Sequence, residues 1–286
     1  MGVVLDGRAA AQEVRQQVRQ EVDRLSKESG VIPGLATVLI GDNPISRVYV
    51  SAKEKACREV GIVSVGFRLP AVVSLSEVLT LIASLNQRTD IHGILVQLPL
   101  PAHLEEERVI EAILPEKDVD GLHPYNQGRF LRGQEGLRPC TPLGAMYLLD
   151  RTGMAPEGKR AVVIGRSLLV GRPVALLLLE RHATVTLCHS HTRDLAQEVK
   201  RAEILVAATG RPDLVKGEWI KEGAAVIDVG ISRLPDGTLK GDVEFAAAKE
   251  RASFITPVPG GVGPMTVAML LVNTVKAAKW QMADSL

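Results

Sequence analysis

A short stretch near residue 50 gathers three side chains that could perform acid–base chemistry. Ser46, Tyr49 and Lys53 are spaced i, i+3 and i+7, which places a hydroxyl, a phenol and an amine along one stripe of a helix. The adjacent Glu54 points elsewhere, and a lysine that faces a pocket without a counter-charge gives up its proton more readily. Lys53 is therefore a candidate general base, although an amphipathic surface helix would also carry such a lysine.

The elements around this stretch follow an α/β pattern. A helix is expected from Asn43 as N-cap to Gly61, and Ser74 with Glu77 forms a capping box that opens the next helix. Apolar runs expected to form strands occupy residues 35–40, 62–69, 92–98, 160–165, 183–189, 204–208 and 224–229. Fully apolar strands separated by helices indicate parallel sheets covered on both faces.

The chain is long enough for two lobes. Residues 115–142 are rich in Gly, Pro and Asp and are expected to form a loop, and a last helix should run to about residue 281. We predict an N-terminal α/β catalytic lobe at residues 1–139 plus 265–286 and a Rossmann-like, doubly wound nucleotide-binding domain at residues 140–264. The expected last helix returns to the first lobe, which predicts a cleft between the two.

A nucleotide site is predicted at the first strand of the second lobe. Residues 161–171, AVVIGRSLLVG, read as strand, tight turn and helix, with Ser167 in place of the usual second glycine and the last glycine at Gly171. The next strand ends without the acidic residue that would bind a ribose hydroxyl, so a 2′-phosphate and NADP are favoured. The candidate cofactor-binding residues are Gly165, Arg166, Ser167, Ser190, Arg193, Thr209, Gly210 and Ile231.

Composition excludes several other classes of protein. The 286 residues are 46% hydrophobic with a net charge of +1, and no basic block or membrane-length apolar run occurs, so neither nucleic acid nor a membrane is an expected partner. Three widely spaced cysteines and the lack of a signal-peptide pattern predict a cytoplasmic protein with reduced thiols. No histidine or cysteine spacing predicts a metal site.

Five motifs together resemble those of the bifunctional methylenetetrahydrofolate dehydrogenase/cyclohydrolase family, in the family order and over nearly the whole chain. They are YxxxK at residues 49–53, GILVQLPLP at 93–101, KDVDG at 117–121, GRS at 165–167 and PVPGGVGPMT at 257–266. The resemblance implies NADP-dependent oxidation of 5,10-methylenetetrahydrofolate to 5,10-methenyltetrahydrofolate, followed by hydrolysis to 10-formyltetrahydrofolate. It also implies a homodimer and a role in one-carbon metabolism and purine biosynthesis.

The same resemblance implies roles for individual residues. Lys53 is the main catalytic residue, with Tyr49 and Gln97 beside it and Asp120 anchoring the pterin. The nearby Asp118 is expected to cap the turn, although the two aspartates could exchange roles. Pro259, Gly260 and Gly261 would form a wall against the ligands, or a hinge between lobes.

Two other functions remain compatible with the residues. One is a shikimate-type NAD(P) dehydrogenase that uses Lys53 and Asp120 on another small acid, and the other is a nucleotide-sensing binding protein without turnover. Ligand-induced thermal shifts distinguish the three, since folates, shikimate-like acids or nucleotide alone would stabilise the protein.

Overall fold

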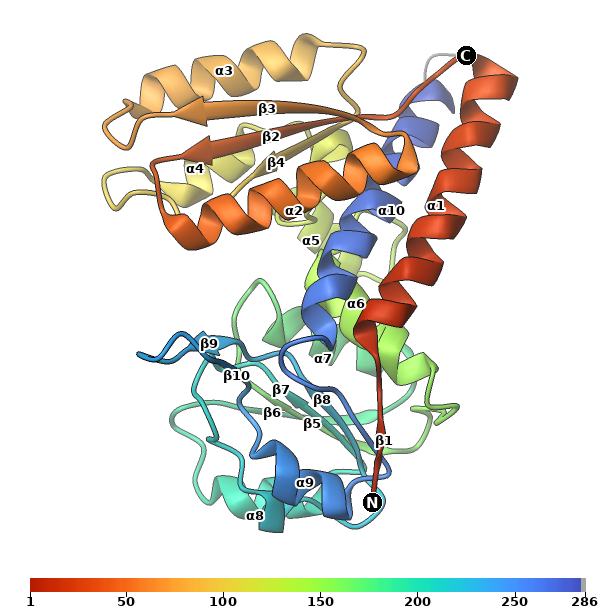
Figure 1. The fold of residues 1–286 in the computed structure, drawn as a ribbon, viewed down its shortest axis with the longest axis vertical. Helices are drawn as coiled ribbons and strands as arrows, with labels where there is room; N and C mark the ends of the chain where they lie inside the picture. Colours follow the sequence, from red (N-terminus) through yellow and green to blue (C-terminus); the bar gives the residue numbers. More distant parts are fainter. Residues whose placement is uncertain (284–286) are drawn as a thin grey trace. The chain divides into compact units, whose positions relative to one another are not determined.

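The computed structural model describes residues 1–283, which form two compact α/β units (Figure 1). One unit contains Gln12–Cys140 with the chain from Val267 onward, and the other contains Met1–Ala11 with Thr141–Thr266. The predicted two-lobed α/β fold class is confirmed. The last three residues of the predicted range 265–286 lie outside the described part of the chain.

The first unit is built on a three-stranded parallel sheet of order β3-β2-β4. The two outer strands pair with β2 in register, with Thr37 opposite Gly66 of β3 and Leu95 of β4. Its elements are β2 (Gly34–Ile40), α2 (Pro44–Val60), β3 (Val63–Leu69), α3 (Leu75–Gln87), β4 (Gly93–Val96), α4 (Glu106–Glu111), the 3₁₀ turn η1 (Pro115–Lys117) and α5 (Pro124–Leu131).

Helices cover both faces of this sheet, as Figure 1 shows for α2 and α3. Val38, Ile94 and Val96 pack with Val78 and Ile82 of α3, while the alternate residues of the strands face α2. The predicted helix boundaries at Asn43, Gly61 and Ser74 are confirmed, including the reciprocal capping box. These caps fix where α2 begins and therefore which of its residues face the sheet.

The second unit is a six-stranded parallel sheet of order β1-β11-β8-β7-β5-β6. The chain runs outward from β5 to β6 and then returns to the other side of β5 with β7, so the strand order reverses at β5. Its elements are β1 (Val3–Val4), β5 (Arg160–Ile164), α7 (Gly171–Glu180), β6 (Thr184–Cys188), α8 (Leu195–Arg201), β7 (Ile204–Ala207), η2 (Gly217–Trp219), β8 (Ala225–Asp228), β9 (Ser232–Arg233), β10 (Leu239–Lys240), α9 (Phe245–Arg251) and β11 (Phe254–Ile255).

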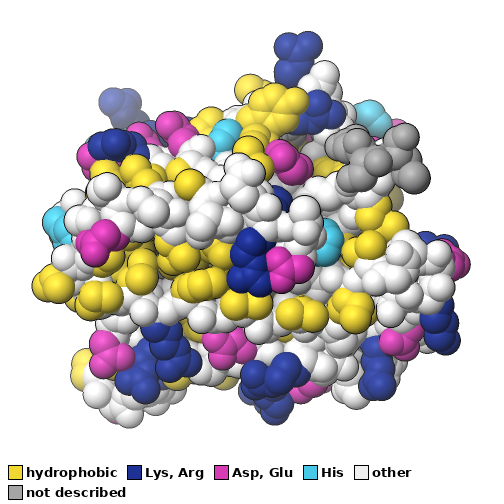
Figure 2. Space-filling model, turned by 90° about the horizontal axis from the view of Figure 1, so that it is seen from above, with side chains coloured by type: hydrophobic (Ala, Val, Ile, Leu, Met, Phe, Trp, Pro, Cys, Tyr) yellow, Lys and Arg dark blue, Asp and Glu magenta, His cyan; other side chains and the backbone are white. Residues whose placement is uncertain are grey.

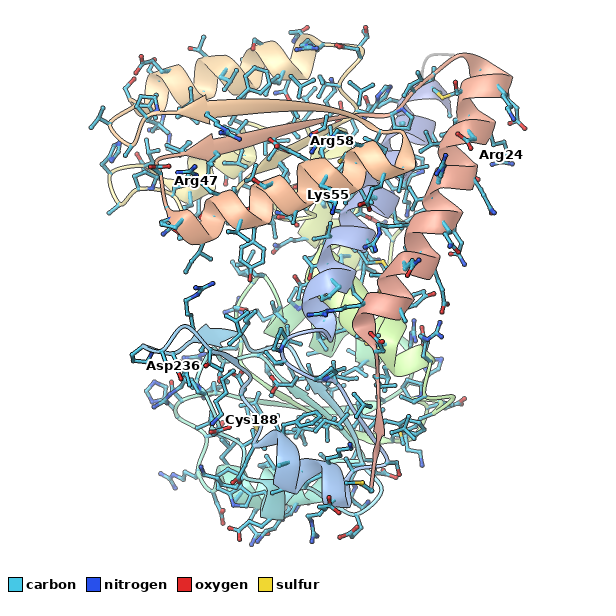
Figure 3. All side chains as sticks on the ribbon, viewed as in Figure 1. Arg24, Arg47, Lys55, Arg58, Cys188 and Asp236 are labelled. Atoms are coloured by element: carbon cyan, nitrogen blue, oxygen red, sulfur yellow. The ribbon has the colours of Figure 1, made fainter. Side chains whose placement is uncertain are left out.

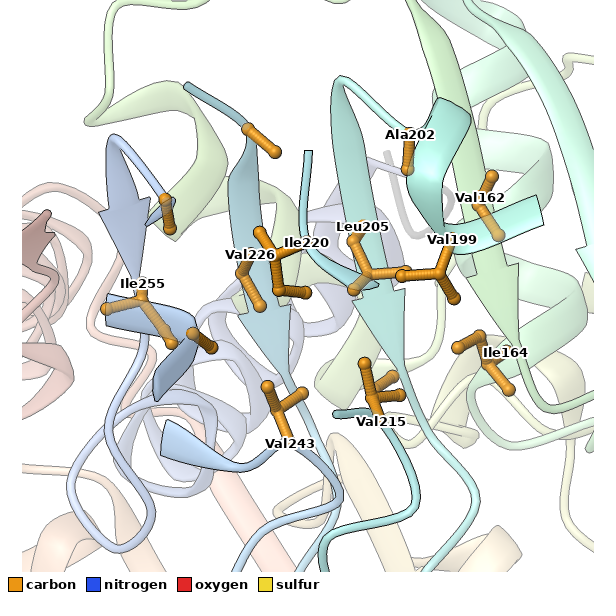
Figure 4. Close-up of a cluster of buried hydrophobic side chains, with 14 of the residues drawn as sticks. Val162, Ile164, Val199, Ala202, Leu205, Val215, Ile220, Val226, Val243 and Ile255 are labelled. Carbon is orange, nitrogen blue, oxygen red and sulfur yellow. The ribbon is translucent and has the colours of Figure 1, made fainter. Parts of the chain in front are cut away.

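An aliphatic core joins this sheet to α8 and α9 (Figure 4). Val162, Leu205 and Val226 come from three neighbouring strands and meet Val199 of α8 and Ala248 of α9. Each of these side chains is almost completely buried, and burial of a Val or Leu side chain contributes about 1.5–3 kcal/mol. The core therefore fixes the positions of the strands. Ligands of such sheets bind at the carboxyl ends of these strands.

The boundary between the two units falls within three helices, α1 (Gly7–Ser29), α6 (Cys140–Asp150) and α10 (Val262–Ala283). The predicted division assigned residues 1–139 to the first lobe, whereas residues 1–11 belong to the second unit because β1 pairs with β11. The segment 115–142 was expected to be a loop, but it contains η1, α5 and the start of α6. Helix α5 begins at Pro124 and is capped by His123. Such a short helix is not recognised from sequence when the segment around it is rich in Gly and Pro.

Charges of both signs are interspersed on the face of the molecule in Figure 2. None of the described helices is long and apolar enough to cross a bilayer. Within residues 1–283, no group of three or more His, Cys, Asp and Glu side chains is arranged to hold a metal ion.

Candidate active site and nucleotide site

Lys53 is the one buried cation of the four on α2. Arg47, Lys55 and Arg58, labelled in Figure 3, are exposed, whereas Lys53 is 9% exposed. Its Nζ donates a hydrogen bond of 3.0 Å to Oε1 of Gln97, just beyond the end of β4. The helix therefore presents one amine to the interior of the first unit and leaves the other cations in solvent.

Gln97 is oriented by a second hydrogen bond. Its Nε2 donates to the carbonyl oxygen of Leu98 at 2.7 Å, which leaves Oε1 directed at Lys53. Because the partner of the amine is a neutral amide, no carboxylate stabilises the ammonium form through this bond. Tyr49 lies one turn before Lys53 on the same stripe and is 37% exposed, so its phenol is open to solvent.

The turn that carries Asp120 is fixed by buried polar groups. Asp118, 2% exposed, accepts hydrogen bonds from the backbone N–H of His123 and from Nδ2 of Asn126. Burial raises the pKa of Asp118 to about 6 against the opposing effect of these bonds. Asp118 thus caps the turn, as expected, and Asp120, which is half-buried, is the aspartate with an accessible side chain.

Asn273, which no sequence motif indicated, and Gly121 of the KDVDG motif hold the other side of this turn. Nδ2 of Asn273, in α10, donates to the carbonyl oxygens of Val119 and Arg138 at 2.8 and 2.9 Å. Gly121 has φ +70°, and a Cβ there would meet the carbonyl carbon of Arg138 at 2.4 Å. The Asp120 turn is therefore tightly packed, and the sequence could not reveal the role of Asn273 because its partners are backbone groups more than 130 residues away.

The buried Cys140 thiol is influenced by the charges of both Asp120 and Lys53. Burial raises the pKa of the Cys140 thiol well above its usual value, Asp120 raises it further, and Lys53 acts in the opposite direction. Both charged groups therefore lie within electrostatic range of the same buried sulfur. Cys57, next on the Lys53 stripe, is fully buried with its pKa raised by burial to about 12, so it acts as core filler, as predicted.

The nucleotide turn after β5 has the close packing of a dinucleotide-binding turn. Gly165 has φ +113°, and a Cβ there would lie 2.1 Å from the carbonyl oxygen of Ala208. A Cβ on Gly171 would lie 1.9 Å from the carbonyl oxygen of Gly165, so α7 starts against the turn. The Ser167 hydroxyl, at the position of the usual second glycine, accepts hydrogen bonds from the N–H groups of Val170 and Gly171 just before and at the start of α7.

The remaining predicted cofactor residues lie at the carboxyl ends of neighbouring strands. Arg166 follows β5, and Ser190 and Arg193 follow β6; all three are exposed. The first acid beyond them, Asp194, is engaged as the N-cap of α8. Thr209 and Gly210 follow β7, and Ile231 follows β8, where the Ser232 hydroxyl donates to the carbonyl oxygen of Gly210 at 2.9 Å.

The residues predicted to line the substrate divide between the two units. Tyr49, Gln97 and Asp120 belong to the first unit. Pro259, Gly260 and Gly261 belong to the second, where a Cβ on Gly261 would lie 2.6 Å from the Pro257 carbonyl oxygen. This packing accounts for Gly261 structurally, and the role of the three residues beside a ligand stays a prediction.

Comparisons with known proteins cover nearly the whole chain. The family model for the catalytic domain of tetrahydrofolate dehydrogenase/cyclohydrolase matches residues 5–120, and the model for the NAD(P)-binding domain matches residues 139–282. The bifunctional protein FolD of Magnetococcus marinus is 58% identical over 279 residues, 98% of each chain.

Solved structures agree with these matches. The bifunctional FolD of Campylobacter jejuni is 46% identical with a TM-score of 0.96, over 98% of this chain and 100% of that one. FolD of Trypanosoma brucei, solved with NADP and an inhibitor, is 43% identical with a TM-score of 0.95 over 98% of each chain. A Thermus thermophilus shikimate 5-dehydrogenase is 18% identical with a TM-score of 0.52, over 87% of this chain and 99% of that one, a likeness of fold alone.

Proposed function

Since the chain belongs to the tetrahydrofolate dehydrogenase/cyclohydrolase family, we propose that it oxidises 5,10-methylenetetrahydrofolate with NADP and hydrolyses the methenyl product to 10-formyltetrahydrofolate. The partly buried hydrogen bond between Lys53 and Gln97 is the observation that carries the hydrolytic half. The Gly165–Gly171 packing carries the oxidative half, because the strand, the turn and the start of α7 approach one another as closely as in a dinucleotide-binding turn.

In the hydrolytic step, Lys53 is the general base. A cationic methenyl group nearby disfavours a charged lysine, so the neutral amine takes a proton from water as the water oxygen bonds to the methenyl carbon. The hydroxyl of this adduct then loses its proton as the carbonyl forms and the carbon–N5 bond breaks, and N5 takes up a proton, which leaves the formyl group on N10. Gln97 keeps the amine in place, and the fixed turn below Asp120 supports its role as anchor of the pterin through two N–H groups.

In the oxidative step, the residues position two rings and need no acid or base. NADP supplies the hydride acceptor when bound. Thr209, Gly210 and Ile231 would contact it at the ends of β7 and β8, near the reversal of strand order at β5. Arg166, Ser190 and Arg193 would bind its 2′-phosphate with two guanidinium groups and a hydroxyl.

The direct test is to mix the purified protein with 5,10-methylenetetrahydrofolate and NADP and to follow reduced cofactor and methenyl product together. The proposal expects reduced cofactor to accumulate without a matching build-up of methenyl product. If neither NADP nor NAD is reduced, the proposed substrate is wrong. Accumulation of the methenyl product in step with reduced cofactor would remove the hydrolytic half.

Cofactor preference is tested separately with Arg193→Ala. We expect KM for NADP to rise about tenfold or more, because a charge-assisted bond to phosphate is lost, while KM for NAD stays the same. Lys200→Ala, at an exposed position on α8, serves as a control. An equal effect of Arg193→Ala on both cofactors would contradict binding of the 2′-phosphate.

The proposal includes a cytoplasmic homodimer. The three cysteines are free and buried, which suits a reducing compartment. Strand β6 forms one edge of the six-stranded sheet, where Leu187 is 37% exposed, and Leu179 of the adjacent α7 is 58% exposed. Light scattering should give twice the chain mass for the wild type, and Leu179→Glu should shift it toward the monomer.

A further inference from the structure

Two buried carboxylates in the second unit have no part in the proposed chemistry. Asp228, at the end of β8, is 3% exposed, and Asp242, between β10 and α9, is completely buried. Burial of a charged group costs free energy unless strong hydrogen bonds compensate for the lost water. The hydrogen-bond donors to these two side chains therefore show which loops the carboxylates fix in place.

Asp242 holds the loop that follows β7. Its Oδ2 accepts hydrogen bonds from the N–H of Thr209, from the Thr209 hydroxyl at 2.9 Å and from the N–H of Gly210 at 3.2 Å. Its Oδ1 accepts from the N–H of Arg211 at 2.8 Å. One side chain thus gathers the donors of three consecutive residues, two of which are proposed cofactor contacts.

Asp228 holds Asp242 in turn. Its Oδ1 accepts from the N–H groups of Gly230 and Asp242, both at 3.0 Å, and its Oδ2 accepts from the N–H of Val243 at 2.9 Å. Gly230 belongs to the loop that follows β8 and leads to Ile231. The two carboxylates therefore link the loops after β7 and β8 through one continuous set of hydrogen bonds.

The backbone around the pair leaves no room for displacement. A Cβ on Gly230 would lie 2.1 Å from Cγ of Asp242, and a Cβ on Gly241 would lie 2.1 Å from Oδ2 of Asp228. A carboxylate offers about four acceptor sites and no donor. Both oxygens of each carboxylate accept backbone N–H groups here, so the NH₂ group of an asparagine in either orientation would face at least one of these donors. Neither aspartate can become asparagine here without a conflict of donors.

We propose that Asp242, supported by Asp228, is a positioning residue that sets the loops 209–211 and 229–231 against the nicotinamide half of the cofactor. The inference rests on the proposed cofactor contacts Thr209, Gly210 and Ile231. Neither carboxylate touches the reacting atoms. Hydride transfer depends on the placement of two rings, so displacement of these loops impairs the oxidative step and leaves the Lys53-based hydrolytic step intact.

The test compares the two half-reactions in Asp242→Asn. We expect KM for NADP to rise or kcat of the dehydrogenase to fall by about tenfold, because at least one backbone donor loses its acceptor. Hydrolysis of supplied methenyltetrahydrofolate, which needs no cofactor, should remain near the wild-type rate. Asp236→Asn is the matched control, since Asp236 (Figure 3) also accepts a backbone N–H, from Thr238, at an exposed hairpin.

Gly230→Ala provides a second variant that keeps both charges. The new Cβ pushes into the Asp242 carboxylate, and the same selective loss of dehydrogenase activity is expected. Hydrogen exchange should become faster at residues 209–211 in both variants. These measurements remain informative if Asp242→Asn folds poorly.

Two results would overturn the inference. One is an unchanged dehydrogenase in both folded variants, and the other is an equal loss of both half-reactions, which would mean a purely structural role. A wild type that reduces neither NADP nor NAD would instead refute the proposed function itself, so the two failures are distinguishable.

Discussion

Nζ of Lys53 donates to Oε1 of Gln97 across 3.0 Å, and this bond joins α2 to the end of β4. The amide cannot reverse without losing the bond from its Nε2 to Leu98. The amide oxygen holds the amine in place without setting a negative charge beside it.

Lys53→Met should separate the two activities. Removing the base should slow hydrolysis on the order of 100-fold or more, while hydride transfer continues, so the methenyl product accumulates with reduced NADP. Absorbance of the methenyl compound measures this directly. Lys55→Met, two residues away on the exposed side of α2, should behave as wild type. Equal clearance of methenyl product in both variants would exclude Lys53 from the mechanism.

Gln97→Glu should keep Lys53 protonated to higher pH, since a carboxylate now faces the ammonium at hydrogen-bonding distance. The hydrolytic rate should fall at neutral pH and recover as pH rises, and the pH–rate profile should move to the alkaline side. Gln87→Glu, at the exposed last residue of α3, is the control for added charge. An unmoved profile with a reduced rate would limit Gln97 to a packing role.

Gly165→Ala should destabilise the nucleotide unit strongly. The residue has φ +113° and its Cβ would lie 2.1 Å from a backbone oxygen, so we expect a loss of roughly 3–5 kcal/mol in the free energy of unfolding. Gly158→Ala is the comparison, because its φ of +71° is also positive but a Cβ there meets open space. That variant should cost about 1 kcal/mol. Urea denaturation measures both, and similar losses would contradict the close approach of Ala208.

Asp228→Asn should change how stability depends on pH. Burial, with the neighbouring Asp242, raises the pKa of Asp228 from 3.8 to about 7. The native state thus binds the proton more tightly than the unfolded chain, so this contribution to stability is complete below about pH 4 and is lost as pH rises through about 7. The free energy of unfolding of the wild type should therefore fall, relative to Asp228→Asn, between those values.

Denaturation with urea at several pH values measures that difference. The difference in free energy of unfolding between the wild type and Asp236→Asn should show no such fall, because the backbone N–H of Thr238 lowers the pKa of the exposed Asp236. A constant difference between the wild type and Asp228→Asn across this range would contradict the prediction.

Sequence reasoning succeeded where a local signal exists. Asn43, Ser74 and Gly61 mark helix ends by their own chemistry, and strands such as β4 and β7 are continuous apolar runs. It missed α1, although Ala10, Val14, Val18 and Val22 are buried at helical spacing. It also missed β1, because two residues are too short for a pattern.

Only those site residues that carry a local sequence signal could be predicted. Lys53 is distinguished by its place on a helix face, and Gln97 by its place after an apolar strand. Asn273 and Asp242 act through backbone groups of residues distant in sequence, such as Val119 and Thr209. No spacing rule connects these partners, so only the folded chain identifies them.

The hydrogen bond from Asn273 to the carbonyl oxygen of Val119 can form only late in the synthesis of the chain. Val119 precedes Asn273 by 154 residues, and a ribosome makes the chain from its amino end. Through most of synthesis, the nascent protein carries Lys53, Gln97 and Asp120 without the helix that secures the turn beneath Asp120. A chain that ended before residue 273 would therefore keep Lys53, Gln97 and Asp120 but lack the two hydrogen bonds by which Asn273 holds the turn next to Asp120.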